Sequence, residues 1–354
     1  MEQETSPLAI VTGGNGWLGR RLVRTLATGL PELPELFRPG RAVRCLVLPG
    51  SDTPPLRELG ERVQIVEGDI TRPPTLASLF TGARGATVFH CAGLIHPRLF
   101  TRRLYQVNVA GTRNVLAAAA AAGARRIVHV SSNSPLGVGR TPDETFDETA
   151  PFHPYMKYGR TKMAAEQLVQ AEVARGSVEG VIIRPPWFYG PGQPPRQTRF
   201  FSMIRVGRVP IVGSGENRRS MAYVDNICQG LLLAEASPRA DGQVYWIADR
   251  RPYTMNEIVD TIERLLEQEF DLPVAHRRMR LPALASRTAW GIDLVLQTLG
   301  LYNQEIHVLS EMNRTIACSI ALAERELGYA PRIDLEEGMR RSIASVLESG
   351  GTIP

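Results

Sequence analysis

A short apolar run, a glycine-rich turn and a helical pattern open the chain, and they constrain its fold more than any other feature. Residues 8–12 read Leu-Ala-Ile-Val-Thr, as in a buried strand, and residues 20–28 have the spacing of a helix. The turn between them contains Gly13, Gly16 and Gly19. Glycine lets the backbone turn tightly here and lets the helix pack closely against the strand. This order predicts the first strand and helix of a parallel sheet.

The same alternation continues through the first half of the chain. Further apolar runs, separated by helical stretches, occur at residues 42–48, 63–66, 87–90, 127–130 and 180–183. This rhythm predicts an α/β fold of the Rossmann type, with a doubly wound parallel sheet covered by helices on both faces.

The glycine loop also has the chemistry of a dinucleotide site. Such a loop lets a pyrophosphate approach main-chain N–H groups, and the start of the following helix favours the phosphate charge. The spacing is G-x-x-G-x-x-G rather than the commoner G-x-G-x-x-G. A plain turn is the alternative interpretation, but the position directly after a strand favours cofactor binding.

The length of the chain suits two lobes. Its 354 residues, 43% of them hydrophobic, can bury a large core. We expect residues 1–183 and about 223–248 to form the NAD(P)-binding domain. A smaller, discontinuous carboxy-terminal lobe that binds substrate is expected from residues 184–221 and 250–354.

Lysine is almost absent from the chain, which makes one lysine informative. Of the 41 Lys and Arg residues, only Lys157 and Lys162 are lysines. Tyr158 precedes Lys162 by four residues, so the two side chains share one face of a helix. A compact ammonium can lie beneath a phenol, lower its pKa from about 10 and hydrogen-bond a ribose. The pair predicts an acid–base site, whereas the nearby Tyr155 does not have this spacing.

Together with the motifs that follow them, these features resemble the extended short-chain dehydrogenase/reductase family. That family includes nucleotide-sugar epimerases and dehydratases, 3β-hydroxysteroid dehydrogenases and dihydroflavonol reductases. The motifs occur in the family's order over nearly the whole chain, at residues 66–70, 88–93, 108–114, 127–132, 184–192, 220–226 and 326–331. They include Asn-Val-Ala-Gly-Thr-Arg-Asn at 108–114 and Arg-Pro-Pro-Trp-Phe-Tyr-Gly-Pro-Gly at 184–192.

The resemblance implies an active site of Ser132, Tyr158, Lys162 and Asn108. Tyr158 would exchange a proton with the substrate oxygen, and Ser132 would hydrogen-bond that oxygen. Lys162 would lower the Tyr158 pKa and hold the nicotinamide ribose, while Asn108 would anchor a relay water. The implied cofactor-binding residues are Gly13, Gly16, Trp17, Leu18, Gly19, Asp69, Ile70, Cys91, Ala92, Gly93, Asn108, Ser131, Tyr158, Lys162 and Pro185.

NAD and NADP are both compatible with the sequence. At the end of the second strand, where this family often carries Asp for NAD or Arg for NADP, the chain has Leu48. A carboxylate there would repel a 2′-phosphate, and neither charge is present. Asp52 or Arg44 could reach the ribose instead, so the choice of cofactor stays open.

Different segments of the sequence favour different classes of substrate. After Arg184, where nucleotide-sugar enzymes of this family carry Asn, the chain has Trp187 and Phe188. Residues 281–302 are largely apolar and resemble the lipophilic carboxy-terminal region of 3β-hydroxysteroid dehydrogenases. These features favour a lipophilic, 3β-hydroxysteroid-like alcohol. Arg219 lies where nucleotide-sugar epimerases bind a diphosphate, so a nucleotide-sugar epimerase or dehydratase is the alternative.

Other classes of protein fit less well. A non-catalytic NADP-binding sensor or scaffold would usually have lost the tyrosine or the lysine. The four cysteines lack metal-ligand spacing, so no metal site is expected. A net charge of +5 without a basic, aromatic-rich stripe does not indicate nucleic-acid binding. The expected partner is a small-molecule substrate, and a homodimer is compatible with the pairing that is common in the family.

The amino terminus and the apolar segment 281–302 bear on the cellular location of the protein and on its contact with membranes. Residues 1–7 are polar and acidic, so we expect no secretory signal and a cytoplasmic protein. Arg287 and Asp293 interrupt the apolar segment, which is therefore not expected to span a membrane. It could pack on the substrate lobe, cap an apolar pocket or make a peripheral contact with a bilayer.

Overall fold

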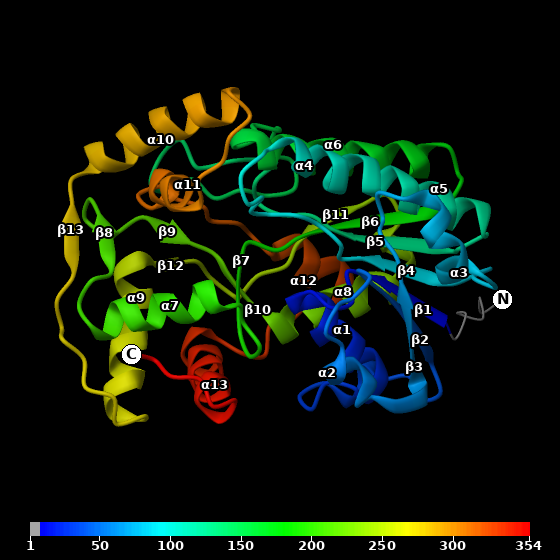
Figure 1. Cartoon of the computed structure of the whole chain (residues 1–354), viewed down its shortest axis with the longest axis horizontal. Helices are drawn as coiled ribbons and strands as arrows, with labels where there is room; N and C mark the ends of the chain where they lie inside the picture. Colours follow the sequence, from blue (N-terminus) through cyan, green and yellow to red (C-terminus); the bar gives the residue numbers. More distant parts are fainter. Residues whose placement is uncertain (1–7) are drawn as a thin grey trace.

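The central feature of the fold is a seven-stranded parallel sheet (Figure 1). The computed structural model describes residues 8–354, and the segment 1–7, which carried the expectation about a secretory signal, lies outside them. The strands lie in the order β11-β6-β5-β4-β1-β2-β3, and all neighbours are parallel. Their bounds are β1 Leu8–Thr12, β2 Ala42–Val47, β3 Val63–Glu67, β4 Thr87–His90, β5 Arg126–Val130, β6 Glu179–Arg184 and β11 Val244–Trp246. The expected doubly wound α/β fold is confirmed.

Helices cover both faces of the sheet because successive strand residues point to opposite sides. Val11 of β1 joins a core formed with α1 and α8, and Ile10 joins a core on the other face formed with α5 and α6. These four helices are α1 Trp17–Thr28, α5 Thr112–Ala121, α6 Met156–Ala174 and α8 Val224–Ala236. The strands are buried from both sides, which explains their continuous apolar runs.

A third core lies beyond the sheet, in a smaller lobe. It is built mainly by α7, α9 and α13, with Phe201, Ile258 and Met339 among its buried residues. The elements of this lobe are α7 Pro195–Arg205, α9 Met255–Gln268, α13 Leu335–Glu348, the parallel pairs β7 Trp187–Tyr189 with β10 Met221–Tyr223 and β8 Pro210–Val212 with β13 Met279–Leu281, and the antiparallel pair β9 Arg218–Arg219 with β12 Tyr253–Thr254. Because α8 and β11 interrupt it in the sequence, the lobe is discontinuous.

The remaining elements are α10 and several short segments. They are α2 Pro54–Arg57, α3 Ala77–Phe80, α4 Arg102–Tyr105, α10 Ala283–Thr298, α11 Gln304–Glu311, α12 Ala321–Leu327, the π-helical stretch Gln106–Gly111, and 3₁₀ turns at Pro34–Leu36, Gly60–Arg62, Pro73–Leu76 and Pro238–Ala240. Among the helices of residues 8–354, none combines the length and apolarity needed to cross a membrane.

The order of the strands indicates where a ligand would bind. β1 lies between β2 and β4, so the chain runs outward from it in both directions across the sheet. In open α/β sheets a ligand binds outside the carboxyl ends of the strands at this reversal. Gly13 follows β1 and Cys91 follows β4 at that point.

Candidate active site

The glycine loop forms a close-packed cradle at the end of β1. Gly13 has a φ of +71°, and a Cβ there would lie 2.8 Å from the main chain of Ala92. A Cβ on Gly19 would lie 2.0 Å from the Gly13 carbonyl oxygen, to which the Gly16 N–H donates at 2.9 Å. Side chains are therefore excluded from the cradle, which fits a site where a pyrophosphate approaches the backbone.

Trp17 and Leu18, which begin α1, have different surroundings. Trp17 Nε1 donates to Pro191 O at 2.8 Å, and its ring lies 6.2 Å from that of Phe188. Leu18 is buried in the core beneath α1. Trp17 thus links the glycine loop to the loop after β7, whereas only the main chain of Leu18 is left for a cofactor.

Residues that follow β3 and β4 continue the candidate site from the glycine cradle. Asp69 Oδ1 accepts hydrogen bonds from the N–H and the hydroxyl of Thr71, both at 2.8 Å, and Oδ2 has no hydrogen-bond partner among the described residues. The side chain of Ile70 packs on Gly111. Burial raises the pKa of Cys91 to about 12, so its thiol is not a nucleophile at neutral pH. Ala92 and Gly93 follow Cys91 directly.

The Asn108 amide is buried and fully engaged as a donor. Its Nδ2 donates to Leu94 O at 2.9 Å and to Thr161 Oγ1 at 3.1 Å, and its Oδ1 accepts from the Leu94 N–H at 2.7 Å. Asn108 therefore joins the loop after β4 to helix α6. This geometry supports a positioning role, because no N–H of the amide is left for the expected relay water.

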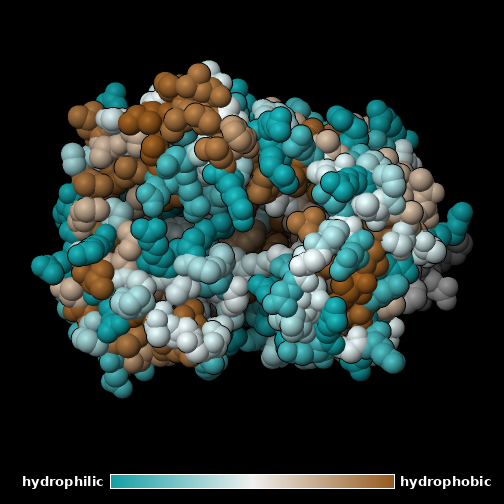
Figure 2. All heavy atoms as spheres, in the orientation of Figure 1, coloured by the Kyte–Doolittle hydropathy of each residue, from teal (hydrophilic) through white to brown (hydrophobic). Residues whose placement is uncertain are grey.

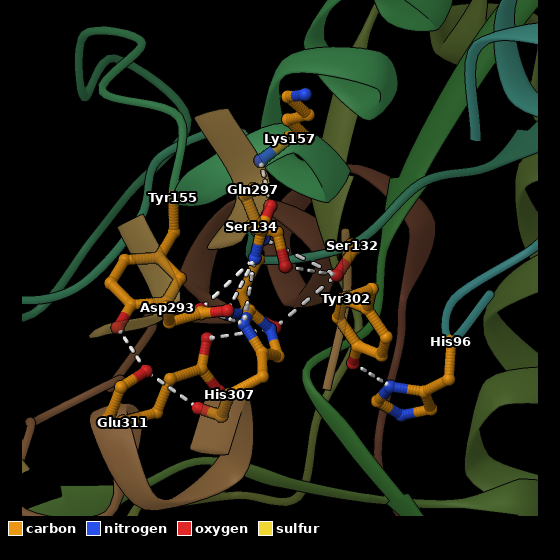
Figure 3. Close-up of polar contacts among 12 residues, drawn as sticks. His96, Ser132, Ser134, Tyr155, Lys157, Asp293, Gln297, Tyr302, His307 and Glu311 are labelled. Atoms are coloured by element: carbon orange, nitrogen blue, oxygen red, sulfur yellow. Dashed lines mark hydrogen bonds and ion pairs between the residues drawn. The ribbon is translucent and has the colours of Figure 1, made fainter. Parts of the chain in front are cut away.

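Ser132 and Tyr158 come together at the carboxyl end of β5. The Ser132 hydroxyl acts on the Tyr158 phenol. Ser132 Oγ also lies 3.3 Å from Ser134 Oγ (Figure 3). Burial raises the pKa of Tyr158 to about 12, while the Ser132 hydrogen bond and the charge of Arg196 act in the opposite direction. The Tyr158 phenol is thus protonated at neutral pH.

Lys162 is buried on the same helix, but it points at the end of β5. Its Nζ donates to Val130 O at 2.8 Å and lies 3.5 Å from His129 Nε2. Burial lowers the pKa of Lys162 to about 8 against the raising effect of Glu166. The lowering of the Tyr158 pKa that was expected from Lys162 is not found, because burial of the phenol raises this pKa and the Lys162 ammonium lies at Val130 O.

Ser131 belongs to a buried polar group that sequence reasoning missed. Its hydroxyl donates to Glu166 Oε1 at 2.5 Å, and Arg184 binds both oxygens of Glu166 at 3.0 and 2.6 Å. The Ser131 side chain is therefore not available to a cofactor, and only its main chain is left for that role. Glu166 lies four residues after Lys162, and this helical spacing could have indicated Glu166 from the sequence.

The residues expected at the substrate have separate environments. Pro185 is buried. Trp187 and Phe188 point to opposite sides of β7: the Trp187 ring lies 5.7 Å from that of Phe200 in the smaller lobe, and Phe188 packs toward Trp17. The two side chains therefore do not form one wall.

Arg219 lies in the smaller lobe and is nearly buried. Its Nη2 donates to Glu311 O at 2.5 Å, and its buried Nε has no hydrogen-bond partner among residues 8–354. Arg196, in the first turn of α7, was missed from the sequence, where one arginine among many carries no signal. Its charge acts on Tyr158 and Tyr302, and it forms no hydrogen bond or ion pair with a described side chain.

A buried polar cluster joins α10 and α11 to the start of α6 (Figure 3). Asp293 and His307 form an ion pair at 2.7 Å, and Gln297 Oε1 accepts from the Lys157 N–H at 3.0 Å. Burial opposes protonation of His307, but the bond to Asp293 raises its pKa overall. The Tyr155 hydroxyl binds Ser310 Oγ at 2.6 Å, so Tyr155 is engaged away from Lys162.

A cavity of about 570 Å³ lies beyond the end of β2. Its lining residues are Ser51, Asp52, Thr53, Pro54, Arg57 and Glu58. Asn15 of the glycine loop donates to Asp52 O at 2.9 Å, which holds the cavity next to the cradle. Arg44 instead points to Gln64, Leu79 and Thr81. Of the two candidates for the ribose, only Asp52 therefore lies beside the cradle.

The sheet, the cradle and the strand-end residues define a nicotinamide-dependent enzyme of the extended short-chain dehydrogenase/reductase class. The chain belongs to the NAD dependent epimerase/dehydratase family, which matches residues 9–248. Membership in this family confirms that the cofactor is a nicotinamide dinucleotide.

Individual relatives extend this picture. The chain is 46% identical to the uncharacterized protein y4nL of Sinorhizobium fredii, over 98% of this chain and 96% of that protein. It is 29% identical to 3β-hydroxysteroid dehydrogenase/decarboxylase isoform 1 of Arabidopsis thaliana, over 97% and 80%. UDP-glucuronic acid 4-epimerase from Bacillus cereus, solved in complex with NAD, superposes with a TM-score of 0.75 at 19% identity, covering 97% and 99%. This last likeness shows the fold alone.

Proposed function

We propose that the chain interconverts a secondary alcohol and a ketone by hydride transfer at a Ser132, Tyr158 and Lys162 site. The observation that carries the proposal is the convergence of three residues beside the glycine cradle: Ser132 follows β5, and Tyr158 lies on α6 together with the buried Lys162, whose Nζ reaches Val130 O at the end of β5. A bound nicotinamide would accept or give the hydride. Residues 1–183 with about 223–248 would hold the cofactor, and residues 184–221 with 250–354 the substrate.

The side chains divide the chemical work. Ser132 and Tyr158 would both hydrogen-bond the substrate oxygen, since the Ser132 hydroxyl is close enough to act on the Tyr158 phenol. Tyr158 takes the alcohol proton during oxidation and returns it during reduction. The donors of Lys162 that Val130 O does not use would hold the ribose. Asp69 Oδ2 is free to accept from the adenine.

We favour a lipophilic substrate of the 3β-hydroxysteroid kind. The apolar Trp187 and Phe188 stand where a polar residue would suit a nucleotide sugar, and the Arabidopsis relative is named for a hydroxysteroid reaction. A nucleotide-sugar epimerase or dehydratase is the second candidate, because the buried Nε of Arg219 lacks a partner that an anionic group would provide. Glu311 O already occupies the Nη2 of that arginine.

A comparison of substrates tests the proposal. Purified protein is incubated with NAD or NADP and either 3β-hydroxysteroids or UDP- and dTDP-sugars, with Tyr158→Phe protein as the blank. Net formation of reduced cofactor with the hydroxysteroids is the expected result. Conversion of a nucleotide sugar without net reduced cofactor would instead establish an epimerase or dehydratase.

Replacing Ser132 by alanine is expected to slow alcohol oxidation about 10²-fold, as for loss of one donor to the reacting oxygen. It also removes a bond that lowers the Tyr158 pKa, so this pKa rises further above about 12. Because oxidation needs the phenolate, the pH limb of kcat/KM for oxidation moves to higher pH. Reduction needs the phenol, so kcat/KM for reduction should not show this rise with pH. An unchanged oxidation limb would contradict the role of Ser132.

The cavity after β2 should set the choice between NAD and NADP. Asp52→Asn removes a carboxylate that would repel a 2′-phosphate, and we expect NADP to gain about tenfold in affinity relative to NAD. Arg57→Gln removes a cation that would attract it and should shift the ratio the opposite way. Binding of both cofactors is measured by titration of protein fluorescence. If the ratio of NADP affinity to NAD affinity is the same in the two variants, the ribose does not lie at this cavity.

A further inference from the structure

Helix α10 is packed with its polar face inward. The buried residues of the helix are Ser286, Ala289, Asp293 and Gln297. On the opposite side Leu284, Val295 and Leu299 are 65%, 60% and 71% exposed. A surface helix of a water-soluble protein normally shows the reverse arrangement. The outward face of α10 is thus suited to an apolar surrounding.

The inward contacts prevent the helix from turning over. Ser286 Oγ donates to Ser310 O at 2.8 Å, Asp293 pairs with His307, and Gln297 accepts from the main chain of Lys157. Rolling the apolar face inward would leave these buried groups without partners, which is costly. The exposure of the apolar side chains is therefore built into the packing.

The apolar surface continues beyond the helix. The exposed residues Ile95, Leu99 and Phe100 precede α4, and Phe100 forms a β-bridge with Leu301 at the end of α10. The Thr101 N–H donates to Gly300 O at 2.9 Å. Figure 2 shows the hydrophobic side chains gathered over α10 on this face. We call α10 and the segment 95–100 the apolar face.

Arginines predominate among the charges in and beside the apolar face, and the exposed Glu305 on the adjoining helix α11 is paired with Arg199. The exposed arginines of the apolar face are Arg98, Arg102, Arg103, Arg280 and Arg287. None of these guanidinium groups forms a hydrogen bond or ion pair with another residue in the described part of the chain. The one acidic side chain in 94–106 and 277–303 is Asp293, which is fully buried and paired with His307. An apolar surface with a cationic rim matches the surface of a bilayer that contains anionic lipid.

We propose that the apolar face of this protein docks on an anionic phospholipid bilayer, with α10 lying in the plane of the interface. A second copy of the chain fits less well, because two such faces would oppose arginine to arginine. Lying on the bilayer does not require a spanning helix. The proposal does not depend on the reaction or the substrate of the active site.

Sedimentation of the full chain with vesicles tests this proposal. Wild-type protein should bind vesicles of phosphatidylcholine with phosphatidylglycerol more tightly than vesicles of phosphatidylcholine alone. Replacing Arg102 and Arg103 by glutamine should weaken binding to the anionic vesicles about fivefold for each arginine. Replacing Val295 and Leu299 by serine should weaken it at least about tenfold.

Matched controls lie on other parts of the surface. Val206→Ser and Arg239→Gln change an exposed apolar and an exposed cationic residue outside the apolar face, and both variants should bind vesicles like wild type. Failure of wild-type protein to bind anionic vesicles would overturn the proposal, as would unchanged binding of the Val295→Ser, Leu299→Ser protein. A wild-type dimer that this double variant converts to a monomer would also overturn it, since a second copy would then cover the face. Cofactor binding by every variant shows that it is folded.

Discussion

Tyr158→Phe protein is expected to lose turnover about 10³-fold while its cofactor affinity stays nearly unchanged. The magnitude is that of a lost general acid–base group. Phenylalanine fills the same half-buried space but has no hydroxyl to meet Ser132 or to exchange a proton with the substrate oxygen. Single-turnover rates with a substrate found by the assay above measure the first effect, and fluorescence titration with the cofactor measures the second.

Tyr155→Phe is the matched control for this experiment. It removes the same atom three residues earlier and breaks the bond to Ser310 Oγ, which lies away from Lys162. We expect a loss of stability of about 1 kcal/mol, as for one hydrogen bond, and turnover close to wild type. Substantial turnover in Tyr158→Phe protein would contradict the acid–base role of Tyr158. Loss of turnover in Tyr155→Phe protein alone would assign that role to Tyr155.

Replacing Lys162 should harm both cofactor binding and turnover. Lys162→Met removes a buried charged donor, and loss of such a bond corresponds to at least about a tenfold rise in the cofactor Kd. Turnover should fall about 10²-fold as well, because the ribose would no longer be held beside Tyr158. Lys162→Arg should fail similarly, since Val130 O and His129 enclose the site and a planar fork is broader than an ammonium.

Lys157→Arg provides the comparison for Lys162. Lys157 is the other lysine of the chain, and its Nζ donates to Thr101 Oγ1 at 3.1 Å near the protein surface. An arginine can make the same bond there, so cofactor affinity and turnover should stay close to wild type. Equal losses in both lysine variants would mean that any change in this helix disturbs the site, and the specific role of Lys162 would be lost.

Much of the site could be predicted because it depends on local spacing. The glycine loop must follow β1 closely, and Tyr158 and Lys162 must share a helix face when they are four residues apart. Such relations lie within one strand, turn or helix. They follow from the chain order and from the periods of regular structure.

Contacts between distant segments could not be predicted in this way. Ser131 and Ser132 are adjacent, yet one hydroxyl binds Glu166 and the other acts on the Tyr158 phenol. Which of them does so depends on how β5 and α6 pack. The same applies to Lys162, whose ammonium reaches Val130 O. It also applies to Arg196, whose charge acts on Tyr158 only because the smaller lobe brings the start of α7 near α6.

The sequence by itself therefore determined the parallel α/β fold, the nucleotide cradle and the tyrosine–lysine pair, because each needs only short-range order. Only the tertiary structure decided which hydroxyl meets Tyr158 and which side of α10 faces the protein. The sequence showed that residues 281–302 are largely apolar, but it did not show that their few buried polar side chains point toward the protein. Asp293 turns inward because His307, from the separate helix α11, packs beside it and, together with Gln297 of the same helix α10, satisfies the buried carboxylate.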